Sequence, residues 1–290
     1  MSTLAENVTK VTEAHAALKE AIAAKGVAVP EGTKLSGMPA LVEQIETPPV
    51  PTNPRAVFAY DNVQRIVVPK LMVVDFGVSR NLSYCFRNCN LLTSLVLPAG
   101  FGQNATSLGY CFYSCTSLTS LVLPAGFGQN ATNIGLCFTS CTSLTSLVLP
   151  AGFGMDAAVM YKTFDSCTSL TSLVLPAGFG QNATNLGYCF YGCTSLASLT
   201  LPAGFGQNAT NLDSCLRDCS SLETITGNPN FKTSFDISSC QKLTHDSLMV
   251  IINGLQTVAP TKNLILGATN LAKLAEDEKK AATDKGWTLA

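Results

Sequence analysis

Residues 108–133 read LGYCFYSCTSLTSLVLPAGFGQNATN, and residues 186–211 read LGYCFYGCTSLASLTLPAGFGQNATN. Between residues 81 and 236 this 26-residue unit is repeated six times with few changes. A unit of this length is too short to bury its own apolar side, so the units must stack and share one core. The repetition therefore predicts a solenoid.

Each unit contains the run Leu-Val-Leu-Pro or a close variant of it, as at Leu121–Pro124. The alternation predicts a short strand whose two Leu side chains point inward and whose Val points outward. Pro ends the strand, and the Gly-rich stretch that follows turns the chain around. Two aromatic columns recur at the same period: Phe86, Phe112, Phe138, Phe164 and Phe190, and Phe101, Phe127, Phe153, Phe179, Phe205 and Phe231. We therefore expect an α/β solenoid, a right-handed coil with one parallel sheet.

Eleven of the twelve cysteines fall into two columns with the period of the repeat, and Cys240 follows in a half-unit after them. The first column holds Cys85, Cys111, Cys137, Cys189 and Cys215, and the second holds Cys89, Cys115, Cys141, Cys167, Cys193 and Cys219. In the fourth unit Thr163 takes the first position, where it could neither form a disulfide nor act as a soft metal ligand, and no His lies nearby. We expect buried free thiols that pack as small apolar groups.

The order Cys-Phe-X-X-Cys-Thr-Ser-Leu-Thr-Ser-Leu-Val-Leu-Pro resembles the BspA-type leucine-rich repeats of bacterial surface proteins. Those coils carry a similar Ala-Phe-X-X-Cys-X-X-Leu-X-X-Ile-X-Ile-Pro core. The resemblance implies a leucine-rich-repeat coil. In this chain Cys replaces the small Ala, and the segment from Pro98 to Leu108 is longer than the usual turn of the family.

The rest of the chain divides by composition. Residues 3–25 predict an amphipathic helix with a short heptad seam, which either packs on its own chain or joins copies in a parallel coiled coil. After the repeats, Thr244 is expected to begin a helix, Leu264–Leu266 a strand, Leu271–Lys285 a helix and Trp287–Leu289 a final strand. The predicted domains are a helical attachment or oligomerisation module (1–46), a Pro-rich linker (47–54), an N-terminal cap coil (55–80), six repeats (81–236) and a C-terminal α/β cap (237–290).

Composition excludes several functions. Only 13% of the residues are charged and the formal net charge is −1, which does not fit a nucleic-acid binder. No apolar run is long enough to span a membrane, and the start lacks the pattern of a secretory signal, so synthesis in the cytoplasm is expected. His15 and His245 lie near no nucleophile pattern. We expect no enzyme activity, no cofactor and no metal site.

Function is then expected on the surface of the coils. Two positions vary between units while their neighbours stay nearly constant, either because exposure permits drift or because they form a recognition face in which Tyr contacts sugar or protein. The candidate residues are Tyr84, Arg87, Tyr110, Tyr113, Thr139, Lys162, Asp165, Tyr188, Tyr191 and Arg217. An outward strip of Val96, Val122, Val148 and Val174 is a candidate surface for self-association.

Both ends of the chain are similar to proteins of phage and prophage tails. The likeness lies in the opening segment around Ala-Ala-Lys-Gly-Val and in the closing segment around Gly-Trp-Thr-Leu-Ala. It favours a receptor-binding, tail-fibre-like virion protein that binds a glycan or protein of the host surface. The N-terminal module would then join other tail proteins, and a homo-oligomer, with a trimer favoured, is expected. The alternatives are a bacterial cell-surface adhesin and a structural filament or spacer subunit.

Overall fold

The computed structural model describes residues 65–67 and 80–290. The chain divides into two units, Met1–Thr52 and Asn53–Ala290, and all the described residues belong to the second. The predicted helical module, the linker and most of the N-terminal cap coil lie outside the described residues.

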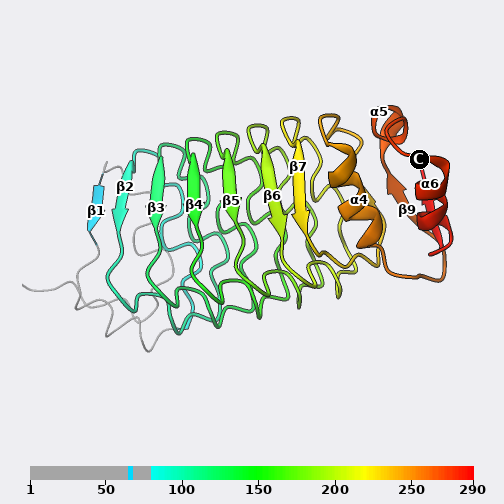
Figure 1. The fold of residues 1–290 in the computed structure, drawn as a ribbon. Coiled ribbons are helices and arrows are strands. Elements are labelled where there is room, and N and C mark those ends of the chain that lie inside the picture. The colour runs from blue at the N-terminus through cyan, green and yellow to red at the C-terminus, as the bar shows by residue number, and fades with distance from the viewer. Residues whose placement is uncertain (1–64, 68–79) are drawn as a thin grey trace, which may run out of the picture. The chain divides into compact units, whose positions relative to one another are not determined.

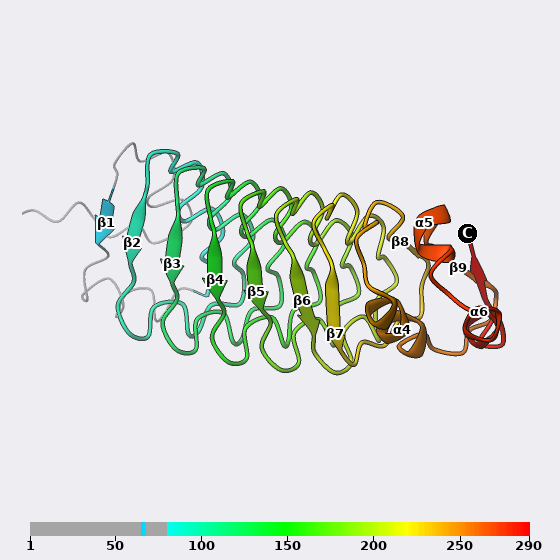
Figure 2. The same ribbon diagram turned by 45° about the horizontal axis from the view of Figure 1, so that its top comes forward.

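A parallel sheet of seven strands follows the order of the chain (Figure 1). Corresponding residues of neighbouring coils pair directly, as Leu121 does with Leu147 and Leu147 with Leu173. In Figure 2 the strands lie along one side of the coils. The bounds are β1 Arg65–Val67, β2 Ser94–Val96, β3 Ser120–Val122, β4 Ser146–Val148, β5 Ser172–Val174, β6 Ser198–Leu201 and β7 Thr224–Gly227.

The strands bury their Leu residues and expose their Val residues. In β3, Leu121 is 5% exposed and Val122 is 78% exposed, and Leu123 directly after the strand is buried. The same alternation repeats in β4 and β5. The predicted inward Leu and outward Val are confirmed, and the strands begin one residue earlier than expected, at Ser.

The opposite side of each coil is a run of tight turns. Within a coil, Cys85 N–H donates to Leu82 O (3.3 Å) and Cys89 N–H to Phe86 O (3.3 Å). The intervening amides bond to the next coil, as Phe86 N–H does to Cys111 O (2.8 Å). This alternation satisfies the buried backbone groups without a helix.

The phenylalanines of each column stack on one another. Phe86 and Phe112 have ring centroids 5.2 Å apart with planes at 2°, and the spacing is 5.4 Å between Phe138 and Phe164. The second column is looser, with 6.3 Å between Phe101 and Phe127. Each such contact adds about 0.5–1.5 kcal/mol to the burial of the rings. Both columns are fully buried and form the centre of the core.

The second cysteine column has a polar role beside its packing. The Cys115 thiol donates to Phe86 O (3.1 Å), and the Cys141 thiol donates to Phe112 O (3.2 Å). The same bond recurs in the later coils. All twelve cysteines are free and buried, as predicted. Thr163, in the first column, also donates to carbonyls, those of Met160 (2.9 Å) and Ile134 (3.3 Å).

The long Gly-rich segment of each coil consists of two successive turns. Phe101 N–H donates to Pro98 O (3.1 Å), and Gln103 N–H donates to Gly100 O (3.2 Å). Gly100 and Gly102 have φ of 82° and 72°. This left-handed backbone carries Phe101 into the core between the two turns.

The C-terminal cap differs in part from the prediction. Helix α4 (His245–Asn253) begins after Thr244, whose side chain accepts from Ser247 N–H, as expected. The predicted helix 271–285 is confirmed only over α6 (Glu276–Thr283), which begins later because the Glu278 carboxylate accepts from Ala275 N–H at its start. A separate short helix that was not predicted, α5 (Gly267–Leu271), precedes it.

The strands of the cap do not extend the main sheet. They form a separate three-stranded parallel sheet in the order β10–β9–β8, with bounds β8 Phe235–Asp236, β9 Lys262–Ile265 and β10 Trp287–Leu289. Helix α4 covers the edge of β7, where the Ser247 hydroxyl accepts from Ile225 N–H (2.9 Å). The open end of the core is thus closed by this helix (Figure 1).

Replacing Gly102 by Ala should destabilise the protein, whereas Gly109→Ala should not. A Cβ on Gly102 would lie 2.5 Å from Phe127 Cδ2 on a backbone with φ +72°. A Cβ on Gly109 would meet nothing closer than 3.6 Å. We expect Gly102→Ala to lower the free energy of unfolding by roughly 1–3 kcal/mol, and Gly109→Ala to change it by less than about 0.5 kcal/mol, in urea denaturation.

His245→Gln should lower the melting temperature more at pH 5.5 than at pH 9. His245 Nε2 lies 2.8 Å from Glu278 Oε1, and this hydrogen bond, with a smaller effect of Asp246, raises the pKa of His245. A raised pKa in the folded state stabilises the fold below the unfolded value and ceases to do so as pH rises through the folded value. An equal loss at both pH values would contradict this.

Candidate functional site

Two columns of side chains on the turn side of the coils form the candidate site. The residue before the first column of cysteines has positive φ in every repeat, as in Tyr84 (65°), Tyr110 (59°) and Tyr188 (56°). This region costs a bulky residue about 1–3 kcal/mol. The bonds from Tyr84 N–H to Gly109 O (3.0 Å) and from Tyr110 N–H to Gly135 O (3.1 Å) hold it in place.

The first group of side chains, here called the N-terminal tyrosine cluster, consists of Tyr84, Arg87, Tyr110 and Tyr113. The rings of Tyr84 and Tyr110 stack at 4.8 Å with planes at 12°, and Tyr113 lies 5.4 Å from Tyr110. The Arg87 Cζ lies 5.5 Å from the centroids of Tyr84 and Tyr113 and 5.8 Å from that of Tyr110. The guanidinium is therefore surrounded by three aromatic rings.

The second group, the C-terminal tyrosine cluster, consists of Tyr161, Lys162, Asp165, Tyr188 and Tyr191. Lys162 Nζ lies 5.1 Å from the Tyr188 centroid and forms an ion pair with Asp165 Oδ2 at 3.0 Å. Its hydrogen bond to Asp165 raises the pKa of Lys162. A hydrogen bond to the Asp218 carboxylate raises the pKa of Tyr191. The charges in this cluster are thus compensated.

A shallow groove of about 220 Å³ runs along the coils beside both clusters. Tyr84 and Tyr110 line it at one end and Tyr161 at the other, with Leu136 between them. Asn81 and Asn133 also line it, and their side-chain oxygens accept from Ser83 N–H and Gly135 N–H (2.9 Å each). The groove thus combines aromatic faces with amide groups.

The structure corrects the expected exposure of two candidate residues. Thr139 and Asp165 are each only 5% exposed. The Thr139 hydroxyl donates to Lys162 O. The Asp165 carboxylate forms an ion pair with Lys162 and accepts a hydrogen bond from the Ser166 hydroxyl (2.8 Å). These side chains are short, so they bond back to the coils. Arg217 is exposed as predicted and lies at the other end of the column.

Sequence reasoning missed Tyr161. It lies in the groove, in the position that Gly109, Gly135 and Gly187 occupy in other units. In this column Ser83 and Asp213 also depart from Gly, and Tyr161 is its one aromatic residue, which was the available signal.

The valine strip lies on the sheet side of the coils. Val96, Val122, Val148 and Val174 are 46%, 78%, 72% and 67% exposed. In β6 and β7 the strip continues as Thr200 and Thr226, whose hydroxyls lie 2.9 Å apart. The strip is therefore a flat apolar surface bordered by Ser and Thr.

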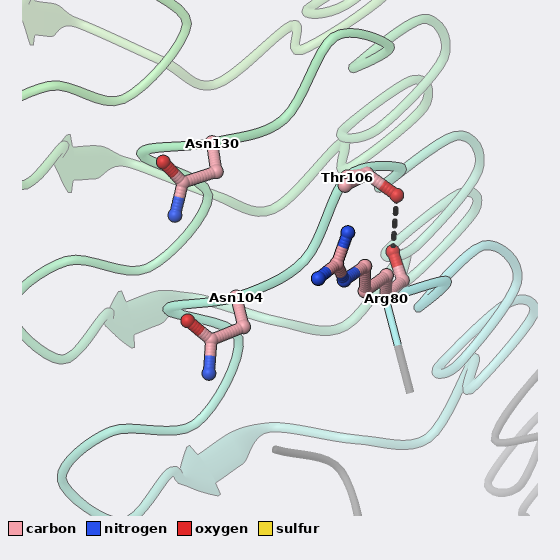
Figure 3. Close-up of a pocket in the computed structure, with 4 residues that line it drawn as sticks. All are labelled: Arg80, Asn104, Thr106 and Asn130. Carbon is pink, nitrogen blue, oxygen red and sulfur yellow. Dashed lines mark hydrogen bonds between the residues drawn. The ribbon is translucent and has the colours of Figure 1, made fainter. Parts of the chain in front are cut away.

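Another hollow, of about 360 Å³, is lined by Arg80, Asn104, Thr106 and Asn130 (Figure 3). The Thr106 hydroxyl donates to Arg80 O (2.8 Å), and Asn130 Nδ2 donates to Gln103 O (2.9 Å). The same Thr and Asn bonds recur in later coils, as from Asn208 to Gln181 O (2.8 Å). These polar groups join neighbouring coils, so we assign them a structural role.

The described residues contain no cluster of metal ligands, and their thiols are poor nucleophiles. No group of three or more His, Cys, Asp or Glu side chains among them could hold a metal ion. Burial raises the pKa of the thiols, to about 12 in Cys167 and Cys215, which disfavours the nucleophilic thiolate. No helix in this part of the chain is long and apolar enough to cross a membrane.

The thiols of the folded protein should not react with a thiol reagent at pH 8. All twelve are buried, and burial disfavours their ionised form. With excess 5,5′-dithiobis(2-nitrobenzoic acid) we expect almost no release of the coloured thiolate until urea unfolds the repeats, and then reaction of all twelve. Rapid reaction of several thiols in buffer alone would contradict the packing described here.

A family model described as BspA type Leucine rich repeat region matches residues 54–179 and 132–256, with six copies. A leucine rich repeat protein of T. pallidum is similar in structure, with 23% identity and a TM-score of 0.44, over 66% of this chain and 77% of that chain. A leucine-rich repeat protein from Bacteroides ovatus ATCC 8483 is 18% identical with a TM-score of 0.32, over 64% of this chain and 58% of that chain. The comparison with curated proteins gave no match.

Proposed function

Because the chain belongs to the family of BspA-type leucine-rich repeat proteins, we propose that it is a non-enzymatic recognition protein that binds a cell-surface glycan or protein. The observation that carries this proposal is the pair of tyrosine clusters beside one groove on the turn side of the coils. Tyr offers a rigid amphipathic surface at low conformational cost, which suits recognition of sugars and proteins.

The position of these tyrosines supports binding rather than packing. Tyr84, Tyr110 and Tyr188 sit outside the core, on backbone with positive φ that such residues rarely adopt. The positive φ belongs to the turn itself, because Leu136, Lys162 and Ser214 share it at the same position of other coils. The core itself is built from the constant Leu, Phe and Cys columns, so the packing of the coils does not require these tyrosines.

For the biological setting we propose the tail of a phage or prophage, with the coils presented to the host surface. The support is the similarity of both ends of the sequence to tail proteins. The N-terminal module would join other tail proteins, and a homotrimer would suit a fibre. The alternative is an adhesin on a bacterial surface. Neighbouring tail and lysis genes would favour the virion protein, and a neighbouring secretion or anchor gene would favour the adhesin.

The valine strip favours a second candidate, a filament or spacer subunit. A flat and exposed apolar surface made by identical coils could seat another copy of the chain. Such a contact would be made by the sheet side, whereas recognition would use the turn side. Substitutions on the two sides therefore separate the two functions.

Replacing Tyr113 and Tyr191 together by Ala should reduce binding of the purified full chain to host cells at least about tenfold. Each truncation removes an aromatic contact from one cluster, and loss of an anchor residue in an interface typically costs more than about 1 kcal/mol. Neither ring belongs to the buried core, so the melting temperature should change little. Binding is measured by flow cytometry with a labelled protein.

The matched control is Val148→Ser, which changes the sheet side and should leave cell binding unchanged. If the double tyrosine variant binds cells like the wild type, the tyrosine clusters are not the recognition surface. If Val148→Ser instead converts large assemblies to small ones in light scattering, the filament function is favoured.

A further inference from the structure

Arg87 is an isolated charge. Between residues 81 and 155 the sequence contains no other Asp, Glu, Lys, Arg or His. The side chain is half-buried among Tyr84, Tyr110 and Tyr113. No described carboxylate pairs with it, and its buried Nε has no hydrogen-bond partner.

This arrangement leaves a cation that the described part of the chain only partly compensates. The faces of aromatic rings attract a guanidinium, but they do not replace the hydrogen-bond acceptors that water supplies. An Arg side chain carries a permanent charge, so the cost of removing water from the guanidinium remains. The terminal N–H groups of the guanidinium can donate two hydrogen bonds to one bound acceptor, and a carboxylate has the matching planar geometry.

The other tyrosine cluster shows the contrast within the same molecule. There Lys162 lies against Tyr161 and Tyr188, but its Nζ forms an ion pair with Asp165 Oδ2 at 3.0 Å. Asp218 adds a second carboxylate next to Tyr191. An anion would be repelled by these carboxylates and attracted to Arg87, so the two clusters differ in the ligand group that they suit.

The groove extends this cationic site into a surface that fits a sugar ring. Tyr84 and Tyr110 belong both to the N-terminal tyrosine cluster and to the lining of the groove. Next to them lie Asn81 and Asn133, whose amide nitrogens bond to no described residue. The volume of about 220 Å³ is below the ~300–1,000 Å³ of pockets for drug-sized ligands, so a small unit is expected.

We propose that the N-terminal tyrosine cluster binds the carboxylate of an acidic sugar in a cell-surface glycan. Arg87 donates its terminal N–H groups to the carboxylate, the Tyr84 and Tyr110 rings contact the apolar face of the sugar, and the two Asn amides donate to its hydroxyls. This inference rests on the proposed recognition function and names the chemical class of its ligand.

The test compares D-glucuronate with D-glucose, which differ in the carboxylate, using the full chain and ligand-observed NMR titration. The wild type should bind glucuronate at least about tenfold more tightly than glucose, because hydrogen bonds to charged groups are the stronger ones. Arg87→Gln should abolish this preference. Arg87→Lys keeps the charge but loses the paired N–H donors of the guanidinium. It should therefore retain only part of the preference for glucuronate.

Lys279→Gln is the matched control, since it removes a cation of the C-terminal cap that already has a partner, Glu276 at 2.8 Å. It should leave the preference for glucuronate unchanged. Melting temperatures of all three variants show whether they are folded. Equal affinity of the wild type for the two sugars, or an unchanged preference in folded Arg87→Gln, would overturn the inference.

Cell binding separates this inference from the broader proposal. If the double variant of Tyr113 and Tyr191 loses cell binding while Arg87→Gln retains it, the recognition surface stands and the acidic sugar is refuted as its ligand. If glucuronate binds through Arg87 but the double variant of Tyr113 and Tyr191 binds cells like the wild type, the carboxylate site is supported. The recognition surface then lies elsewhere on the molecule.

Discussion

The register between neighbouring coils is the constraint on which the rest of the structure depends. Amides such as Leu82 N–H and Phe86 N–H donate to Ser107 O (2.9 Å) and Cys111 O (2.8 Å) of the next coil. Unpaired buried amides are costly, so each coil must place the same backbone groups at the same height as its neighbours. The repeats are therefore equal in length, and the side chains inside them form columns.

This constraint explains which residues are free to vary. A buried column such as Phe86 to Phe190 must keep its shape, because each ring packs on the one above and below. The cysteine column must also keep its donor, since each thiol bonds to a carbonyl of the preceding coil. Only side chains outside these columns can change without loss of stability, and they are where a binding surface can develop.

The proposed site uses that freedom in two ways along one face. Near the start of the repeats a cation lies among tyrosines with no carboxylate of the described residues paired to it, and farther along a similar cation is neutralised by Asp165. Neither arrangement is needed for the stacking of the coils. The same scaffold can thus offer chemically different surfaces in successive units, because the backbone register does not depend on them.

How far the sequence reaches can be judged from particular residues. The period predicted the parallel strands, the inward Leu121, the outward Val122 and the buried thiols, because stacking imposes one environment on each column. It failed where contacts are local and irregular. The helix predicted for residues 271–285 begins only at Glu276, where Glu278 caps its start at Ala275. Thr139 and Asp165 are buried because they bond back to the coils.

The sequence by itself determined that similar units share one core, since a fixed period leaves no other way to bury so many apolar side chains. Only the tertiary structure decided which side chains form one site. The grouping of Arg87 with three tyrosines, the pairing of Lys162 with Asp165 and the place of Tyr161 in the groove depend on side-chain directions across neighbouring coils. Sequence spacing does not specify those directions.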